Sequence, residues 1–453
     1  MSRPTISLCM IARNEESFIE GCLVSVRGIC HETIVVDTGS SDRTMEIARA
    51  AGAQVLETPW TDDFAAARNV GVERATGSHI LVLDADERLG PGMGPGLMEA
   101  AADANLLLGC LPLYNASTLD ATPEEILDGT KLLNGPVFVP RLFRNLPEMR
   151  FERRVHETLT RGFNDLQAKG VGQSIAVGAA LIHYGDVPTY REDHAKDERN
   201  ERLLRMSLED DPADGEIAGY LVVQLIKRGL VDEARRVGED CFDAFVARND
   251  GRPEGYLPDN MVRIGYALGL AQAETGAPAT GKVTVQTAQR FTPDGHPNLD
   301  YVEGLCAFGA GDLDRAEACF REALACDGRN FSQPVLPFIT NELPRIKLAG
   351  VALTRGFPED ALAVLPEPKG TWRFAVDLVR AEVELARGDA SAAMEILSTF
   401  VDLPRLAPDW HVLVHRAMTE LGQDTDGLLE AAAAADSTAW LERRRRIAML
   451  EQA

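Results

Sequence analysis

Basic residues and long hydrophobic runs are both scarce in this chain of 453 residues. It has 46 Lys and Arg against 70 Asp and Glu, a formal net charge of −24. Nucleic acid and anionic lipid are bound through basic surface, so neither is expected as a general partner. No apolar run approaches the ~18–20 residues that cross a bilayer, and the run near the start is too short for a secretion signal. We expect a cytoplasmic protein without a membrane span.

Paired cysteines are missing too. The 8 cysteines are scattered, none forms a Cys-x-x-Cys pair, and a chain of this length needs no disulfide framework. Free thiols are therefore expected. The hydrophobic share of 45% and the charged share of 26% are typical of a globular protein with a large core. At roughly 100–200 residues per domain, the length predicts two or three domains.

Strand and helix patterns alternate up to about residue 190. Short apolar runs predict strands at residues 5–12, 33–37, 54–57 and 78–83, and segments with helical spacing separate them. This β-α-β order predicts a mainly parallel sheet that helices cover on both faces. Ligands bind at the carboxyl ends of the strands in such sheets, and Asp37 and Asp84 both lie at such ends.

Helical patterns continue from about residue 200 to the end. One segment has the small and aromatic residues of a tetratricopeptide-like hairpin, at Gly304, Ala307, Ala316, Phe320 and Ala323. A second copy follows the same offsets at Ala381, Ala393, Leu397 and Phe400, and weaker copies lie around Ala234 and Ala361. Small residues let two helices approach closely, and the aromatic residue fills the space between hairpins. We expect a first domain at 1–195 and a helical repeat domain at 196–453, with a generic helical domain as the alternative.

Three carboxylates stand at predicted strand ends, namely Asp37, Asp84 and Asp86. Carboxylates gathered at one sheet edge repel each other unless a cation or a cationic ligand lies between them. Mg²⁺ and Mn²⁺ prefer such oxygen ligands and commonly bridge to phosphate oxygens. The pattern therefore indicates a divalent cation and a phosphate-bearing ligand at this edge.

Several motifs occur in a fixed order through the first half. They are residues 11–16 (IARNEE), 35–42 (VVDTGSSD), 67–69 (ARN), 83–87 (LDADE), 154–157 (RVHE) and 182–185 (IHYG). In this order they resemble glycosyltransferase family 2, the inverting nucleotide-sugar transferases of GT-A fold. With the helical second half, the chain is similar to the bacterial subgroup that includes peptide S-glycosyltransferases.

The resemblance implies a role for each matching residue. Those implied to bind the donor nucleotide-sugar, normally a UDP-sugar, are Ala12, Asn14, Glu15, Asp37, Arg68 and Asp84. Asp86 would bind the Mn²⁺ or Mg²⁺ that neutralises the leaving diphosphate, and His156 and His183 are candidates for further metal contacts.

Inversion by a single displacement also needs a base for the acceptor proton. Glu157 is the candidate here. The family often carries a later Glu-Asp pair in this role, and residues 192–193 and 209–210 offer such pairs. They lie in helix-like sequence beyond the predicted sheet, so the identity of the base stays open.

The expected function is metal-dependent transfer of a sugar to a protein or peptide acceptor that the repeats position. The alternatives are a lipopolysaccharide-core or small saccharide acceptor, and a scaffold with an inactive transferase domain. A nucleotidyltransferase would carry a glycine-rich loop after its first strand, whereas residues 12–16 contain no glycine. A homodimer through the helical repeats is a further expectation. The sequence does not name the sugar.

Overall fold

The computed structural model divides into two compact units, residues 1–207 and 208–453. It describes residues 3–133, 136–187, 196–249, 258–292, 295–325, 335, 337–368, 372–400 and 408–427. Helix α8 (Lys196–Asp210) contains the division between the units. Within the described ranges, no helix is long and apolar enough to span a membrane, and the cysteines are free thiols.

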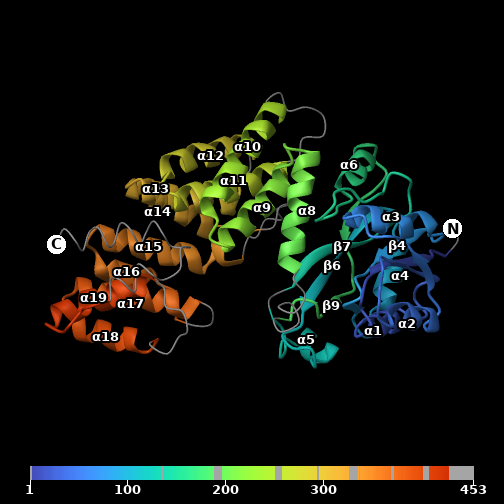
Figure 1. Ribbon diagram of the computed structural model, residues 1–453, viewed down its shortest axis with the longest axis horizontal. Helices are drawn as coiled ribbons and strands as arrows, with labels where there is room; N and C mark the ends of the chain where they lie inside the picture. Colours follow the sequence, from blue (N-terminus) through green and yellow to red (C-terminus); the bar gives the residue numbers. More distant parts are fainter. Residues whose placement is uncertain are drawn as a thin grey trace. The chain divides into compact units, whose positions relative to one another are not determined.

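A nine-stranded mixed sheet forms the centre of the first unit (Figure 1). Its strands are β1 (Ile6–Ala12), β2 (Glu32–Asp37), β3 (Gln54–Glu57), β4 (His79–Val82), β5 (Glu87–Leu89), β6 (Leu106–Asn115), β7 (Val137–Arg144), β8 (Gln173–Ala176) and β9 (Leu181–His183). Their order is β3-β2-β1-β4-β7-β6-β9-β5, and β8 pairs with β6. Strands β1 to β4 pair in parallel, as the sequence predicts, whereas β7 runs antiparallel to β4 and β6.

Helices cover both faces of this sheet, which confirms the predicted layers. They are α1 (Ile19–Ser25), α2 (Thr44–Ala50), α3 (Phe64–Arg74), α4 (Gly94–Ala102), α5 (Pro123–Leu127) and α6 (Thr160–Ala168). Leu8 of β1 packs in a cluster with α1, α2 and α4, and its neighbour Cys9 packs in the opposite cluster with α3 and α6. Successive strand residues point to opposite faces, so burial on both sides explains why β1 is apolar except for Ser7.

Close packing of α3 on the sheet brings Arg68 to the strand ends. A Cβ at Gly71 would lie 3.2 Å from Val36 Cγ2 on β2, so glycine allows the helix to approach the strand closely. Arg68 lies three residues earlier and therefore on the same side of the helix. Asp63 caps the start of α3, because its Oδ1 accepts a hydrogen bond from the Ala66 N–H at 2.8 Å.

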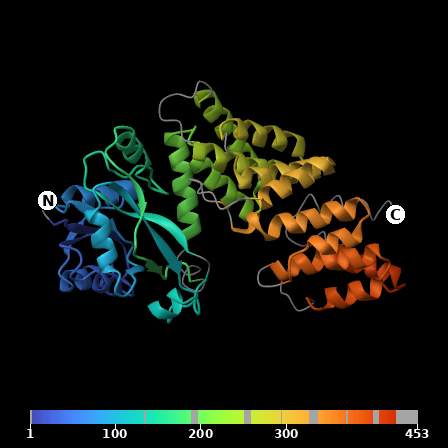
Figure 2. The same cartoon turned by 180° about the vertical axis from the view of Figure 1, so that it is seen from behind.

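The second unit consists of helical hairpins (Figures 1 and 2). Its helices are α9 (Gly215–Lys227), α10 (Val231–Asn249), α11 (Pro258–Glu274), α12 (Pro278–Arg290), α13 (Pro297–Gly309), α14 (Leu313–Leu324), α15 (Glu342–Thr354), α16 (Pro358–Val364), α17 (Arg373–Ala386), α18 (Ala390–Ser398) and α19 (Pro408–Glu420), with the short 3-10 helix η1 (Pro337–Thr340) before α15. A left-handed glycine follows the first helix of each complete hairpin, at Gly229, Gly276, Gly311, Gly356 and Gly388.

The packing inside the hairpins confirms the predicted repeat. A Cβ on Gly304 would lie 2.6 Å from Phe320 Cε1, so the glycine of α13 makes room for the aromatic ring of α14. Ala307, Ala316 and Ala323 are buried around them. The described part of the second unit contains helices and no strands, as expected.

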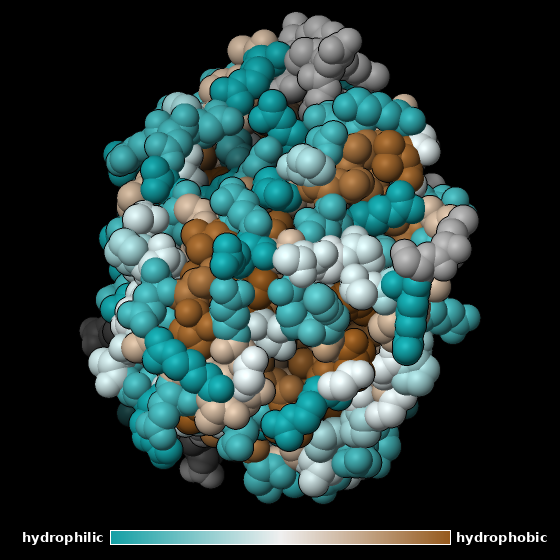
Figure 3. All heavy atoms as spheres, turned by 90° about the vertical axis from the view of Figure 1, so that its right-hand side faces the viewer, coloured by the Kyte–Doolittle hydropathy of each residue, from teal (hydrophilic) through white to brown (hydrophobic). Residues whose placement is uncertain are grey.

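Hydrophilic residues cover most of the surface that faces the viewer in Figure 3, and hydrophobic residues show between them in separate patches. Large hydrophobic side chains with high exposure are few among the described residues, and Phe138 of β7 and Val283 of α12 are the most exposed at 63% each. A surface of this kind is typical of a chain with a strong net charge.

Candidate functional site

The predicted site residues of the first unit meet where the parallel strands end. Ala12 is the last residue of β1 and pairs with Asp37, the last residue of β2. Asp84 and Asp86 follow β4, and the strand that starts at Glu87 pairs with β9, which ends at His183. The structure thus places at one sheet edge residues that are far apart in the sequence.

Asp37 offers an open acceptor at this edge. The residue is 2% exposed, and its Oδ1 accepts hydrogen bonds from the N–H groups of Gly39 at 2.9 Å and Ser40 at 2.8 Å. Its Oδ2 is buried and has no hydrogen-bond partner among the described residues. A buried acceptor of this kind is normally satisfied, so Oδ2 fits a ligand N–H or O–H.

The loops after β1 and β2 are tied to each other beside Asp37. Asn14 has a left-handed backbone with φ of 56°; its N–H donates to Ser40 Oγ at 2.9 Å and its Oδ1 accepts from the Ser41 N–H at 2.8 Å. The Ala12 carbonyl accepts from the Thr38 N–H at 3.0 Å. These bonds give Ala12 and Asn14 a role in building the loop, and their role in donor binding stays a prediction.

Glu15 belongs to the same pair of loops. Its backbone N–H donates to Thr44 Oγ1 at 2.7 Å, at the start of α2. This bond fixes the position of Glu15 next to the strand ends. The contact of Glu15 with a nucleotide stays a prediction.

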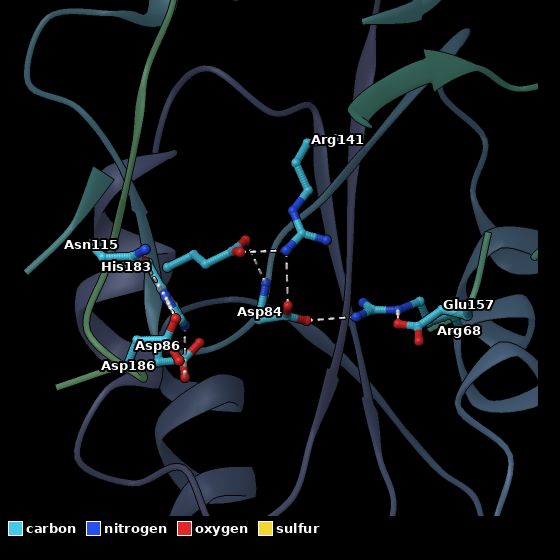
Figure 4. Close-up of polar contacts among 9 residues, drawn as sticks. Arg68, Asp84, Asp86, Asn115, Arg141, Glu157, His183 and Asp186 are labelled. Carbon is cyan, nitrogen blue, oxygen red and sulfur yellow. Dashed lines mark hydrogen bonds and ion pairs between the residues drawn. The ribbon is translucent and has the colours of Figure 1, made fainter. Parts of the chain in front are cut away.

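Charged side chains of alternating sign form a row across the strand ends (Figure 4). This charge row consists of Glu157, Arg68, Asp84, Arg141 and Glu87. Arg68 Nε donates to Glu157 Oε1 at 2.6 Å, and its Nη2 donates to Asp84 Oδ1 at 2.7 Å. Arg141 Nη2 donates to Asp84 Oδ2 at 3.0 Å and also to Glu87 Oε1.

Burial and neighbouring charges both shift the pKa values of the residues in the charge row. Burial disfavours the ionised Asp84, but Arg68 and Arg141 on either side outweigh burial and hold the pKa of Asp84 well below its usual value. Burial also disfavours the charged Arg68, yet Asp84 and Glu157 raise its pKa. Burial raises the pKa of Glu87, and the nearby carboxylates add to this effect.

Two hydrogen-bond donors of the charge row are left for a ligand. Arg68 Nη1 and Arg141 Nε are buried and have no hydrogen-bond partner within the described parts of the chain. Both guanidinium groups contact Asp84. Buried donors without partners are costly in an empty site, so their position next to Asp84 favours an anionic or hydroxyl-rich ligand there.

Asp86 and His183 lie together beyond the charge row (Figure 4). His183 Nε2 is 3.6 Å from Asp86 Oδ2, and its Nδ1 is 2.8 Å from the side-chain oxygen of Asn115. The amide oxygen of Asn115 can only accept, so it assigns a proton to Nδ1 and orients Nε2 toward Asp86. Gly185 leaves room here, because a Cβ would lie 2.0 Å from Asp86 Oδ2.

Burial lowers the pKa of His183, but the hydrogen bond and charge of Asp86, together with the charges of Glu87 and Asp186, raise it overall. A divalent cation fits one carboxylate oxygen and one imidazole nitrogen that face each other. No described group of three or more His, Cys, Asp or Glu side chains has the arrangement of a metal site. Any cation held here would therefore take most of its ligands from phosphate oxygens and water.

The remaining predicted residues are His156 and the two later Glu-Asp pairs. His156 is exposed, with φ of 53°, and its role as a metal ligand stays a prediction. Residues 192–193 lie outside the described residues, and Glu209 and Asp210 are exposed at the end of α8.

Three contributors to the site carry no prediction from the sequence. Arg141 comes from β7 and Asn115 from β6, and Glu87 lies inside the LDADE motif without an assigned role. Arg141 lies within the apolar run of β7. A charged residue inside such a run is the signal that could have identified it. Its target could not be identified, because the antiparallel pairing of β7 with β4 was not predicted.

Helix α8 is joined to the loop between β3 and α3 within the first unit. Arg202 donates from Nη1 and Nη2 to the two carboxylate oxygens of Asp62, both at 2.7 Å, and Trp60 Nε1 donates to Asp62 Oδ1 at 2.7 Å. The guanidinium carbon of Arg199 is 5.3 Å from the centre of the Phe64 ring. The part of α8 up to residue 207 therefore belongs structurally with the strand ends.

Comparisons with known proteins agree with this geometry. The sequence model described as Glycosyl transferase family 2 matches residues 7–158. A TPR repeat-containing protein of Synechococcus elongatus is 37% identical over 277 residues, which is 60% of this chain and 62% of that relative. The SPbeta prophage-derived glycosyltransferase SunS of Bacillus subtilis is 38% identical over 85 residues, or 18% of this chain and 20% of that protein. This chain thus spans less than two thirds of each relative.

Solved structures show more distant likeness. A tetratricopeptide repeat protein from Parabacteroides merdae has a TM-score of 0.38 at 16% identity, covering 54% of this chain and 85% of that chain. Glucosyl-3-phosphoglycerate synthase from Mycobacterium tuberculosis has a TM-score of 0.30 at 20% identity, covering 46% and 78%. The family match, together with the strand order and the hairpins, confirms the expected class, an α/β GT-A domain followed by an all-α repeat domain.

Proposed function

We propose that this chain transfers a sugar from a nucleotide-diphosphate donor to an acceptor, with inversion at the anomeric carbon, because residues 7–158 match the sequence model described as Glycosyl transferase family 2. The observation that carries the proposal is the charge row at the strand ends, with the open Asp37 Oδ2 on the parallel strands and the Asp86–His183 pair near β9. A donor of this type has a nucleoside, a diphosphate and a sugar, and the site offers a different group for each.

The nucleoside belongs next to Asp37. Its buried Oδ2 accepts a hydrogen bond from a ribose hydroxyl or from a base N–H. Uracil carries such an N–H, which supports a UDP-sugar. Glu15 and the loop around Asn14 would border the same pocket, since they are tied to the loop that follows Asp37.

The diphosphate belongs between the charge row and Asp86. Asp86 and His183 would hold Mn²⁺ or Mg²⁺, and Asn115 keeps His183 Nε2 in position. When bound, such a cation neutralises the negative charge that forms on the departing diphosphate. Arg68 Nη1 and Arg141 Nε are available as donors to phosphate or sugar oxygens.

Glu157 is the proposed base. Its side chain is 16% exposed and is held through Oε1 by Arg68, so Oε2 is the oxygen we assign to the proton. The acceptor heteroatom forms a bond to the anomeric carbon as the bond from that carbon to the diphosphate oxygen breaks. The acceptor proton passes to Glu157 in the same step. Arg68 would thus orient Glu157 and Asp84 together.

The acceptor is proposed to be a protein or peptide that the helical unit positions. Stacked helical hairpins present extended surfaces that commonly bind peptides. A lipopolysaccharide-core or small saccharide acceptor is the alternative. The cytoplasmic location and a homodimer through the repeats stay predictions.

The first test is release of UDP from a panel of UDP-sugars, with Mn²⁺ and with EDTA, by wild type and Asp86→Ala. We expect one sugar to be hydrolysed with Mn²⁺ and the Asp86→Ala rate to fall roughly 100-fold or more. Asp165→Ala, on the exposed face of α6, is the matched control and should behave as wild type. Silence across the panel, with no thermal shift on adding any donor, would contradict the proposal.

A further inference from the structure

The segment that carries Glu157 is a short closed loop. Glu152 and Thr158 form an isolated antiparallel bridge at its base. The Glu152 N–H donates to the Thr158 carbonyl oxygen at 2.9 Å, and the Thr158 N–H donates to the Glu152 carbonyl oxygen at 3.1 Å. Residues 153–157 lie between the two ends of this bridge. We call residues 151–158 the Glu157 loop.

Two residues of the Glu157 loop have a backbone conformation that residues other than glycine rarely adopt. Arg153 has φ of 76° and His156 has φ of 53°, which places both in the left-handed region. Such a backbone is costly and persists only where the surrounding structure holds it, and it is frequent at active sites. Contacts with the rest of the first unit must therefore fix this loop.

Helix α3 contacts the Glu157 loop at three places. The N–H of Phe64, the first residue of the helix, donates to the Arg154 carbonyl oxygen at 2.8 Å. Arg68 Nε donates to Glu157 Oε1 at 2.6 Å. The next residue, Asn69, contacts the start of the loop. Because all three contacts come from one helix, the position of the loop follows the position of α3.

Asn69 pairs with the backbone of Phe151 in both directions. Its Nδ2 donates to the Phe151 carbonyl oxygen and its Oδ1 accepts from the Phe151 N–H, both at 2.9 Å. The Phe151 ring lies under Arg68, whose guanidinium carbon is 5.7 Å from the ring centre, and it meets the Phe143 ring of β7 edge to face. A side-chain amide that forms both bonds fixes a backbone residue in position and in orientation.

The position of the Glu157 carboxylate matters because a base acts only within hydrogen-bond distance of the proton that it removes. A displacement of about 1 Å can lower the rate of a reaction about 100-fold. Arg68 holds one carboxylate oxygen of Glu157, but it does not hold the backbone from which Glu157 extends. That backbone is held at the base of the loop, next to Phe151.

We infer that Asn69 is a positioning residue for Glu157 and acts through the backbone of Phe151. Phe151 adjoins Glu152, the bridge joins Glu152 to Thr158, and Thr158 adjoins Glu157. Asn69, the last residue of the ARN motif, carries no prediction from the sequence and has this role in the structure. The effect on proton transfer rests on the proposed function, whereas the hold of Asn69 on the loop does not.

The test compares Asn69→Ala with Asn145→Ala in the full-length chain, with the UDP-sugar that wild type hydrolyses. Asn145 is the matched control, because its Nδ2 also forms two bonds to backbone, with the carbonyl oxygens of Ala75 and Gly77, both at 3.0 Å. It lies at the opposite edge of the sheet, where β4 begins. We expect Asn69→Ala to lower kcat about 10- to 100-fold and to leave the donor KM within about twofold, since the nucleoside contact proposed at Asp37 is outside the loop. Asn145→Ala should change neither value by more than about twofold.

A double variant separates an effect through Glu157 from general damage to the fold. Glu157→Gln has already lost the base, so adding Asn69→Ala should lower kcat by no more than about twofold further. Asn69→Asp keeps the shape and the acceptor but loses the donor to Phe151, and its kcat should lie between those of wild type and Asn69→Ala. The inference would be overturned by a wild-type kcat in Asn69→Ala, or by the same fractional loss in both backgrounds.

Hydrogen exchange measures the hold on the loop without any activity. Exchange of the amides of residues 151–158, followed by mass spectrometry, should be faster in Asn69→Ala than in wild type and unchanged in Asn145→Ala, while β1 and β2 stay protected in both variants. Equal exchange of the loop in Asn69→Ala and wild type would also overturn the inference. Failure of the proposed function looks different: a wild type that hydrolyses no donor, with a loop that exchanges faster in Asn69→Ala, would retain the positioning role and lose the transferase proposal.

Discussion

Both units bury charged side chains, but Glu303 of the second unit and the charged residues at the strand ends of the first differ in how completely their atoms are paired. In the second unit, Glu303 of α13 is fully buried and accepts hydrogen bonds from Arg315, Gln286 and Gln289, two on each carboxylate oxygen. In the first unit, Asp37 Oδ2, Arg68 Nη1 and Arg141 Nε are buried with none. A fully paired buried charge holds structure together, whereas open buried polar atoms mark where a ligand binds.

Asp84 of the first unit and Asp300 of the second have pKa values that are shifted in opposite directions. Arg68 and Arg141 outweigh the effect of burial on Asp84 and hold its pKa low. Asp300 of α13 has no such pair of cations; burial, followed by the charges of Glu322 and Glu303, raises its pKa to about 6. One unit therefore keeps a carboxylate ionised at every working pH, and the other holds one near its titration point.

The largest expected effect comes from breaking the charge row at Arg68. Arg68→Gln leaves Asp84 and Glu157 without their shared cation, so donor hydrolysis should fall on the order of 1000-fold. UDP release under saturating donor and Mn²⁺ measures the loss. Arg74→Gln, exposed on the same helix, should keep the wild-type rate. A hydrolysis rate near that of wild type in Arg68→Gln would show that the charge row has no part in the chemistry.

A smaller effect, on stability only, is expected for the paired charge of the second unit. Arg315→Leu leaves the buried Glu303 carboxylate without its cation. Since the Arg315 side chain is itself 36% exposed, we expect a loss of about 2–3 kcal/mol rather than the full cost of a buried pair. Urea unfolding measures it, and donor hydrolysis at low temperature should be unchanged. Arg321→Leu, exposed on the same helix, is the control; equal stability of the two variants would contradict the comparison.

The smallest effect is a change in pH dependence at Asp300. The folded pKa of about 6 lies above the ordinary value of 3.8, so the folded state binds the proton more tightly and the contribution of Asp300 to stability falls as pH rises from about 4 to about 6. Asp300→Asn should thus stabilise the chain by roughly 1–2 kcal/mol at pH 7 and by much less at pH 4.5. The neighbouring charges that bear on Asp300 are Glu322, Glu303 and Arg315.

Thermal and urea unfolding of Asp300→Asn at both pH values, beside wild type, measures this difference. Asp243→Asn, on an exposed position of α10, should show no pH-dependent gain. A gain in Asp300→Asn that is the same at pH 4.5 and pH 7 would mean that Asp300 titrates normally.

Local features of the sequence were sufficient for much of the fold. The strands β1 to β4 follow from short apolar runs, and the hairpins follow from small residues at helical spacing with a glycine at each turn. Apolar periodicity and turn glycines act within a few residues, so a single sequence reveals them. The same holds for the strand-end carboxylates Asp37, Asp84 and Asp86, because parallel strands place their carboxyl ends at one edge.

Contacts between distant segments decided the remaining strand pairings and the partners of the charged residues in the site. Arg141 reaches Asp84 across 57 positions, and Arg68 reaches Glu157 across 89. Asn115 and His183 meet because β6 and β9 pair in parallel. No local pattern specifies which strands pair or in which register, since pairing depends on how the whole sheet packs.

The sequence by itself determined the two kinds of domain, the motifs that match the glycosyl transferase family 2 model, and the carboxylates at the strand ends. The tertiary structure decided which cations neutralise those carboxylates and which polar atoms stay open. The physical reason is that residue type and periodicity set what each segment can bury. Whether a buried charge is paired depends on segments that only folding brings within hydrogen-bond distance.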